Sequence, residues 1–213
     1  MVELKLRMKT VDLPYAVRIF NVTEEMFDEM VDEDTKAELI DGVMIVHSPA
    51  SLLHDRVAHF LRALMGCYAS EKGLGEVFGP DGLVHLAASR KFGPDIFFVE
   101  QERVPRTLSS EQKEFEGAPA LVLEILSPSN RADDLEEKRP AYRKAGVQEI
   151  WFVDPDNREI IIDRRRGPKN YVTTTIRKGK ASSLVLPGFW LEAEWLWSWP
   201  LPKELACLRK ILK

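Results

Sequence analysis

Apolar and polar positions along the chain alternate in patterns that predict short strands and amphipathic helices. Residues 23–30 open with a threonine and two glutamates, which is typical of a helix N-terminus and predicts a short helix. An Asp-Gly turn at 41–42 precedes an apolar run at 43–46, which predicts a strand after the turn. Over about 51–69, large apolar residues recur every three or four positions, which predicts a long amphipathic helix.

The second half of the chain predicts further strands and one more helix. This helix is acidic at its start and basic at its end, as the helix dipole favours, and Gly146 stops it. Pro140 either kinks it or stands in the first turn of a regular helix that begins near Arg139. Residues 101–117 are polar, and we expect a surface excursion there. In chain order, the elements are strands at 83–86, 95–99 and 120–126, a helix at about 133–145, and a hairpin of strands at 149–154 and 159–163.

The composition is that of a globular protein. Apolar residues make up 45% of the 213 residues and charged residues 30%, which excludes a disordered chain, a collagen repeat and a disulfide scaffold. At roughly 100–200 residues per domain, we expect a single α/β domain over 1–213. Within it, the tryptophan-rich residues 186–213 are expected to be a C-terminal embellishment that packs on the core or on another subunit; a base-stacking platform is the alternative.

Charge and cysteine content narrow the class of partners and the compartment. With 30 basic and 34 acidic residues the net charge is −4, which argues against permanent residence on DNA or on an anionic membrane. A nuclease stays open, because a bound divalent cation supplies positive charge that a sequence does not display. The chain has two distant cysteines, no signal-like N-terminus and no apolar run near the ~18–20 residues of a membrane span, so we expect a cytoplasmic protein without membrane contact.

Glu124 is the residue that fits its neighbours least. It interrupts the apolar run 120–126, whose composition implies burial on both faces of a sheet. A bare carboxylate loses much solvation there, so a cationic partner, a shifted pKa or a metal ion must offset the loss. A second carboxylate, Asp95, starts another apolar strand. Two acids from neighbouring strands suit a hard cation such as Mg²⁺, whereas a buried ion pair is the structural alternative.

Lys138, Glu38 and His54 are further candidates, each with a structural alternative. Lys138 lies on the helix after the Glu124 strand, which should pack back against the sheet, but its charged neighbours also fit a solvated helix face. Glu38 also fits an exposed acid at a helix end. His54 falls in the first turn of its predicted helix, where a neutral imidazole is ordinary.

Several short motifs occur in one order over about residues 37–197, and together they resemble a known family. They are Glu38-Leu-Ile-Asp-Gly42, Ser48-Pro-Ala-Ser51 with His54, Pro94-Asp95, Leu123-Glu-Ile-Leu-Ser-Pro-Ser129, residues 133–138, Tyr142, Gly146-Val-Gln-Glu-Ile-Trp151 and Leu186-Pro-Gly-Phe189. This series resembles the Uma-type restriction-endonuclease family (domain of unknown function 820), a branch of the PD-(D/E)XK nuclease superfamily. The ordered combination carries the resemblance, because no single motif is specific.

The resemblance implies a restriction-endonuclease-like fold, in which helices flank a mixed β-sheet. It also implies that Asp95, Glu124 and the backbone carbonyl of Ile125 hold a divalent metal ion. In the superfamily pattern a lysine stands two residues after the second acid, but here that position is Leu126. Members of this family supply the lysine from the following helix instead, which maps onto Lys138.

The remaining two candidates take their roles from the same resemblance. Glu38 resembles the acid contributed by the family's first helix, which would hold a metal-bound water or a second ion. His54 resembles the family's histidine.

The function implied is a DNA endonuclease that uses Mg²⁺ or Mn²⁺ to hydrolyse phosphodiester bonds. The chain has neither a phosphate-cradling Gly-rich loop nor a Gly-x-Ser-x-Gly elbow, which argues against a nucleotide triphosphatase and a serine hydrolase. Two alternatives stay open. One is a nuclease fold that has lost its chemistry and binds nucleic acid or protein. The other is a metal-dependent phosphoesterase acting on RNA or another substrate; a homodimer is left open in each case.

Overall fold

The computed structural model describes residues 16–213 apart from 33, 34, 48, 106, 108, 110, 111, 113, 129 and 169. The N-terminal segment 1–15 and two motif residues, Ser48 and Ser129, therefore lie outside the described residues. The helices are α1 (Glu24–Met30), α2 (Leu52–Lys72), α3 (Arg139–Ala145) and α4 (Glu204–Ile211), with 3-10 turns η1 (Gln101–Arg103) and η3 (Ala193–Trp197) and a π-helical turn η2 (Asp133–Lys138).

The strands form two six-stranded sheets and a two-stranded ribbon. The first sheet has the order β1 (Ala16–Phe20), β3 (Val43–His47), β2 (Ala37–Ile40), β6 (Arg90–Phe92), β5 (Leu83–Ala87) and β8 (Glu114–Glu116). The second has the order β12 (Tyr171–Ile176), β11 (Glu159–Arg165), β10 (Glu149–Asp154), β9 (Leu121–Ile125), β7 (Ile96–Glu100) and β4 (Gly75–Phe78). The ribbon pairs β13 (Lys180–Ser182) with β14 (Trp190–Glu192).

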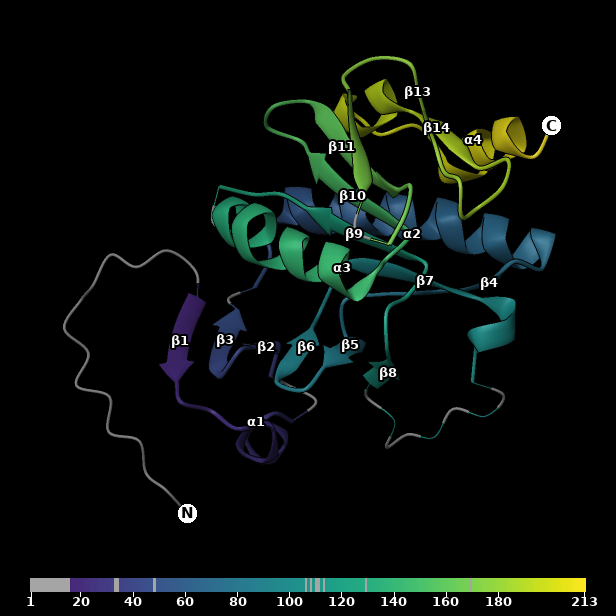
Figure 1. The fold of residues 1–213 in the computed structure, drawn as a ribbon. Coiled ribbons are helices and arrows are strands. Elements are labelled where there is room, and N and C mark those ends of the chain that lie inside the picture. Colours follow the sequence, from purple (N-terminus) through teal and green to yellow (C-terminus); the bar gives the residue numbers. More distant parts are fainter. Residues whose placement is uncertain are drawn as a thin grey trace.

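The second sheet is mixed and is covered by a helix on each face, as predicted. β9 and β10 run parallel, whereas β7 and β11 pair with them antiparallel. In Figure 1, α2 passes behind β9 and β10, and α3 lies in front of them. Leu123 of β9 belongs to the core cluster of α2, whereas its neighbour Val122 belongs to the cluster of α3. This alternation is how a strand buries two faces at once.

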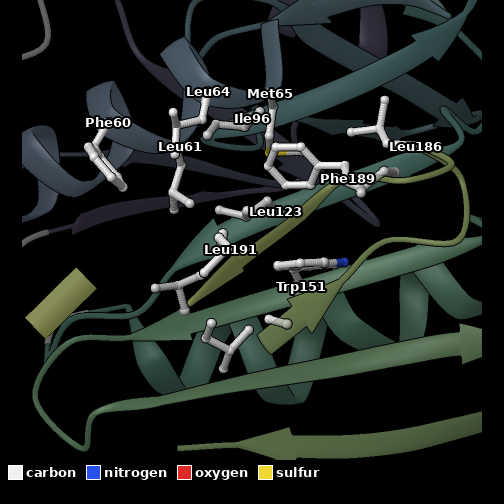
Figure 2. Close-up of a cluster of buried hydrophobic side chains, with 14 of the residues drawn as sticks. Phe60, Leu61, Leu64, Met65, Ile96, Leu123, Trp151, Leu186, Phe189 and Leu191 are labelled. Atoms are coloured by element: carbon white, nitrogen blue, oxygen red, sulfur yellow. The ribbon is translucent and has the colours of Figure 1, made fainter. Parts of the chain in front are cut away.

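The larger core cluster fills the space between α2, the second sheet and the C-terminal segment. Figure 2 shows Phe60, Leu61, Leu64 and Met65 of α2 facing Leu123 and Trp151 of the sheet, with Leu186, Phe189 and Leu191 beside them. Cys207 and Ile211 of α4 belong to the same cluster. The C-terminal segment is thereby packed onto the core of the sheet that carries Glu124.

The tryptophans of this segment take two different environments. Trp190, Trp195 and Trp197 are partly buried and pack against the larger core cluster, as the packing prediction required. Trp199 is 84% exposed, and the guanidinium of Arg56 lies 4.0 Å from its ring centroid. No helix among the described residues combines the length and the apolar character needed to cross a bilayer.

Most elements predicted from the sequence are present. Thr23 caps α1 by accepting a hydrogen bond from the Met26 N–H, and α2 begins at its predicted place and runs three residues beyond the predicted end. The turn at 41–42 has positive φ at both residues, which suits the tight hairpin between β2 and β3.

The described residues of 101–117 lie at the surface, as predicted: none of them is buried, although the stretch also contains a short strand. Within the described part of this stretch, β8 forms a strand that pairs in parallel with β5. A three-residue strand with the sequence Glu-Phe-Glu has no periodic signal of its own, so that pairing, rather than local pattern, makes it a strand.

The helix predicted over 133–145 is interrupted by a π turn, and Pro140 explains the interruption. The regular helix α3 begins at Arg139 with Pro140 in its first turn, which is one of the two predicted arrangements. The Arg139 N–H donates to the Asp134 carbonyl five residues back. A proline has no N–H and collides with the carbonyl four residues before it in an α-helix, so a wider turn before Pro140 relieves both problems.

Candidate metal-dependent active site

Asp95 and Glu124 face each other across two neighbouring strands. Ile96 of β7 pairs with Leu123 of β9 in antiparallel register, which sets Asp95 opposite Glu124. The Asp95 N–H donates to Glu124 Oε2 at 3.4 Å, and both side chains are almost fully buried. Asp95, which immediately precedes β7, and Glu124 of β9 therefore meet where two neighbouring strands of one mixed sheet pair, close to each other as predicted.

Asp95 is held by contacts from three segments of the chain: strand β9, helix α2 and the residue just before β2. Its Oδ2 accepts from the Ile125 N–H at 2.8 Å and lies 3.0 Å from His54 Nε2. Lys36 Nζ lies 3.8 Å from the other oxygen. Burial alone would raise the pKa of Asp95, but the His54 hydrogen bond and the Lys36 charge outweigh it, and the pKa is lowered. The lowered pKa favours the anionic form of Asp95, which is the form that can ligate a cation.

His54 reaches Asp95 because of the way α2 begins. Ser51 caps the helix by accepting from the His54 N–H at 3.2 Å, which fixes the first turn beside Asp95. His54 is 9% exposed. Its predicted place in the first helical turn is confirmed, and its partner is the carboxylate that the resemblance assigns to metal binding.

Glu38 is not a helix residue, and this corrects the expectation taken from the family's first helix. It lies in the middle of strand β2 and is 1% exposed, which also excludes the exposed helix-end acid. The tight turn after Ile40 turns this segment into a hairpin, and the pairing with β3 makes it a strand. The acid still reaches the cluster, because β2 ends beside the loop of Gly93, whose N–H donates to Glu38 Oε1 at 2.8 Å.

Lys138 is buried among acids, so the alternative of a solvated helix face is wrong. Its side chain is 6% exposed. The ammonium lies 2.9 Å from Glu38 and 3.4 Å from Glu124, which confirms the predicted placement near Glu124. Burial would lower the pKa of Lys138, but Asp134, Glu124 and Glu38 outweigh it and raise the pKa well above its usual value. The amine is therefore protonated in this arrangement.

Asp134 is a third acid around Lys138 that the sequence analysis did not single out. It is fully buried, and its Oδ1 lies 3.1 Å from Lys138 Nζ. Neither carboxylate oxygen has a partner in hydrogen-bond geometry among the described residues. Burial raises the pKa of Asp134 well above its usual value, although Lys138 offsets part of the rise. The π turn carries both Asp134 and Lys138 and turns them inward.

Neighbouring groups offset the negative charge of Glu124 less completely than they offset that of Asp95 or Glu38. Tyr142 donates its hydroxyl hydrogen to Glu124 Oε1 at 2.6 Å. Burial raises the pKa of Glu124, and the nearby Asp95 and Glu38 charges add to the rise against the opposing effect of Lys138. By contrast, Lys138 and His47 outweigh burial at Glu38 and lower its pKa to about 2. A further positive charge beside Glu124 and Asp95 would stabilise the ionised form of both carboxyl groups.

Part of this cluster lines one pocket of about 400 Å³, whereas Glu38, Asp134 and Tyr142 lie outside its lining and contact Lys138 or Glu124. Among its lining residues are Lys36, His47, His54, Asp95, Glu124, Asn130 and Lys138. The carboxyl groups of Glu38, Asp95, Glu124 and Asp134 outnumber the ammonium groups of Lys36 and Lys138. Clustered oxygen donors with excess negative charge fit a hard divalent cation. The Ile125 carbonyl, the third expected ligand, accepts a hydrogen bond from Asn130 Nδ2 at 3.2 Å and keeps a second lone pair.

The structure adds four residues that sequence reasoning missed. His47 Nε2 lies 2.9 Å from Glu38, and Lys36 flanks Asp95. Tyr142 and Asp134 were parts of the motif series without a role. Tyr142 had a readable signal, since it stands four residues after Lys138 and shares its helix face. The other three had none, because their partners come from distant strands or from the π turn.

Comparison with known proteins places this chain in a family. No curated protein matches the sequence. Among solved structures, the crystal structure of a "putative nuclease belonging to DUF820" from Anabaena variabilis matches with a TM-score of 0.71 at 20% identity. The match covers 84% of this chain and 98% of that one, so the two share a fold. The model of the Uma2 family, described as "Putative restriction endonuclease", matches residues 24–194, and the chain belongs to that family.

Proposed function

We propose that this protein is a divalent-metal-dependent endonuclease that hydrolyses phosphodiester bonds in DNA. The observation that carries the proposal is the convergence of Asp95, Glu124 and Lys138 on one pocket, two acids from paired strands and a buried lysine from the following helix. Membership of a family described as restriction endonucleases supports a nucleic-acid substrate.

Asp95, Glu124 and the Ile125 carbonyl would hold Mg²⁺ or Mn²⁺, with Glu38 holding a bound water or a second ion. The ion would polarise the phosphate and acidify a water molecule. Asp95 is suited to ligation because its pKa is lowered, so it stays anionic at neutral pH. A bound cation would offset the repulsion that Asp95 and Glu38 exert on Glu124, and the pKa of Glu124 would then fall.

Lys138 would act on the water and on the developing phosphate charge. Its ammonium, 3.4 Å from Glu124, stands beside the expected metal ligands, where it can stabilise negative charge in the transition state. Glu38 and Asp134 hold the ammonium from the protein side at 2.9 and 3.1 Å. His54 would orient Asp95 through their hydrogen bond, and its imidazole lines the same pocket.

Plasmid cleavage tests the proposal. Purified protein should nick supercoiled plasmid DNA with Mg²⁺ or Mn²⁺ and lose the activity with EDTA. Glu124→Ala should abolish nicking, whereas Glu76→Gln, a change of an exposed glutamate on β4, should leave it unchanged. Nicking that persists in Glu124→Ala protein would refute the assignment of this pocket. Competition with single-stranded RNA separates a DNA nuclease from a phosphoesterase with another substrate.

A binding module that has lost its chemistry is the second candidate. The observation that favours it is Leu126, which is 2% exposed and stands where the superfamily pattern has its lysine. Wild-type protein that binds DNA in a gel-shift assay but cleaves neither DNA nor RNA with any divalent cation would support this second candidate over the first.

A further inference from the structure

A separate group of potential metal ligands lies on the first sheet, away from the pocket described above. His85 of β5 pairs with Glu116 of β8 in parallel register, and Glu114 stands two residues before Glu116 on the same face. One ligand atom from each of these three residues lies within 4.8 Å of the others. None of the three lines the pocket of Asp95 and Glu124.

The His85 ring has a carboxylate at each of its two nitrogens. Nδ1 lies 3.2 Å from Glu116 Oε1 and 3.6 Å from Glu114 Oε2. Nε2 lies 2.8 Å from Glu24 Oε1 on α1, yet this buried nitrogen has no partner in hydrogen-bond geometry among the described residues. A neutral imidazole carries one N–H, so one nitrogen must point its lone pair at a carboxylate. Only a second proton or a cation removes that repulsion.

The surroundings fix the orientation that a metal ligand needs. Glu24 is held in place because its Oε2 accepts from the Ser89 N–H at 3.1 Å. With a cation at Nδ1, the ring proton moves to Nε2 and faces Glu24. That is the carboxylate–histidine–metal arrangement by which proteins orient a ligating histidine.

Lys91 pairs with one oxygen of Glu114 and leaves the other oxygen free to bind a metal ion beside His85. Its ammonium, 4% exposed, lies 2.7 Å from Glu114 Oε1, which leaves Oε2 on the side of His85. The same ammonium lies 2.6 Å from Asp28. Four carboxylates, those of Glu24, Asp28, Glu114 and Glu116, therefore surround one lysine and one histidine, so negative charges outnumber positive ones in this group.

We propose that His85, Glu114 and Glu116 bind a divalent transition-metal ion such as Zn²⁺, in a site separate from the proposed catalytic centre. One nitrogen and two oxygen donors suit Zn²⁺, whereas Mg²⁺ prefers oxygen donors alone. Two donors on one Zn²⁺ stand at most about 4.2 Å apart, and rotation of Glu116, whose side chain is 76% exposed, closes the remaining gap. The ion would link α1 to the edge of the first sheet.

Zinc titration calorimetry on the full chain tests the site, carried out in an Asp95→Asn background to weaken binding at the catalytic pocket. One equivalent of Zn²⁺ should bind. Glu116→Gln should weaken that affinity at least tenfold without disturbing the fold, because its side chain is exposed. Glu76→Gln is the matched control, an exposed glutamate of the other sheet, and should leave the affinity unchanged. Mg²⁺ should not compete at equal concentration.

Two further measurements make the outcome decisive. Co²⁺ bound in place of Zn²⁺ should give a visible absorption band that is lost in His85→Ala and in Glu116→Gln. Circular dichroism on each variant shows whether it is folded, and Glu116→Gln carries the test if His85→Ala is not. Zinc isotherms of Glu116→Gln that overlay those of the parent protein would overturn the proposal, as would the absence of zinc binding at neutral pH. Neither result depends on whether the protein cleaves DNA.

Discussion

One helix separates two ion clusters of opposite character. Lys138, at the end of the π turn, points into the pocket among Glu38, Glu124 and Asp134. The next residue, Arg139, points to the other side and binds Asp163 of β11 with two hydrogen bonds of 2.7 Å. Both clusters contain fully buried carboxylates, and the consecutive residues Lys138 and Arg139 each supply a cation to one of them.

The two clusters differ in charge balance. Asp163 has two arginines, Arg139 and Arg143, and also accepts from Thr173 at 2.7 Å. Burial would raise the pKa of Asp163, but these hydrogen bonds outweigh it and lower the pKa to about 2. In the pocket the acids outnumber the cations, and the pKa values of Glu124 and Asp134 are raised. The Asp163 cluster is complete without a ligand, whereas the pocket would gain from an added cation.

The largest effect should come from removing the pocket's central cation. Lys138→Ala should reduce metal-dependent cleavage by about 100- to 10,000-fold, because the water and the phosphate lose their charged partner. Mn²⁺ affinity, measured by calorimetry, should be spared, since lysine is not a ligand. Lys138→Arg should not rescue cleavage, because a guanidinium is larger and does not release its proton.

The neighbouring arginine is the internal control for Lys138. Arg139→Ala should lower stability through Asp163 but cleave DNA at nearly the wild-type rate at a temperature where it is folded. Full activity in Lys138→Ala would contradict the role given to the lysine and would make the pocket a structural ion cluster like that of Asp163.

The same comparison explains how far the sequence could predict the site. A charge inside an apolar strand run is a strong signal, so Glu124 could be found from its neighbours alone, whereas Asp95, at the start of a strand, was found only in combination with Glu124. Asp134 could not, because its run of six charged residues around Leu135 has the composition of a solvated helix face. What turns it inward is the π turn before Pro140, and no periodicity of 3.6 residues describes that turn.

The fold was predictable to a similar degree. Strands with continuous apolar runs, such as β9 and β10, are recognisable because both faces are buried. The strand of Glu38 has only four residues, and its pairing partners, rather than its own pattern, fix its structure. Arg139 and Asp163 lie 24 residues apart on different elements, which is why their pairing could not be read from the sequence.

The second largest effect should be on stability, at the balanced cluster. Asp163→Ala leaves Arg139 and Arg143 half-buried without their shared anion, and should lower the free energy of unfolding by about 3–5 kcal/mol. Urea denaturation followed by tryptophan fluorescence measures the loss. A change below about 1 kcal/mol would mean that the cluster is not the balanced structural element described above.

Acid should reveal the same cluster with a smaller effect. The folded pKa of Asp163, about 2, lies below its ordinary value of 3.8, so its contribution is present above pH 4 and is lost as the pH falls through about 2. The difference corresponds to about 2 kcal/mol. Urea denaturation of wild type and Asp163→Asn between pH 5 and pH 2 should show stabilities that converge as the pH falls. Parallel curves would contradict the lowered pKa.

The smallest effect, and the one of opposite sign, should follow from Glu124→Gln in the metal-free protein. The change removes an acid that Asp95 and Glu38 repel, while Lys138 keeps Glu38 and Asp134 as partners at 2.9 and 3.1 Å. Glutamine retains an oxygen that can accept the Tyr142 hydroxyl. The free energy of unfolding without metal should therefore stay unchanged or rise by about 1 kcal/mol. Added Mn²⁺ should stabilise the wild type but not the variant, because binding to the folded state alone raises stability. A loss of about 3 kcal/mol without metal would instead assign Glu124 to the same class as Asp163, an acid kept for its ion pairs.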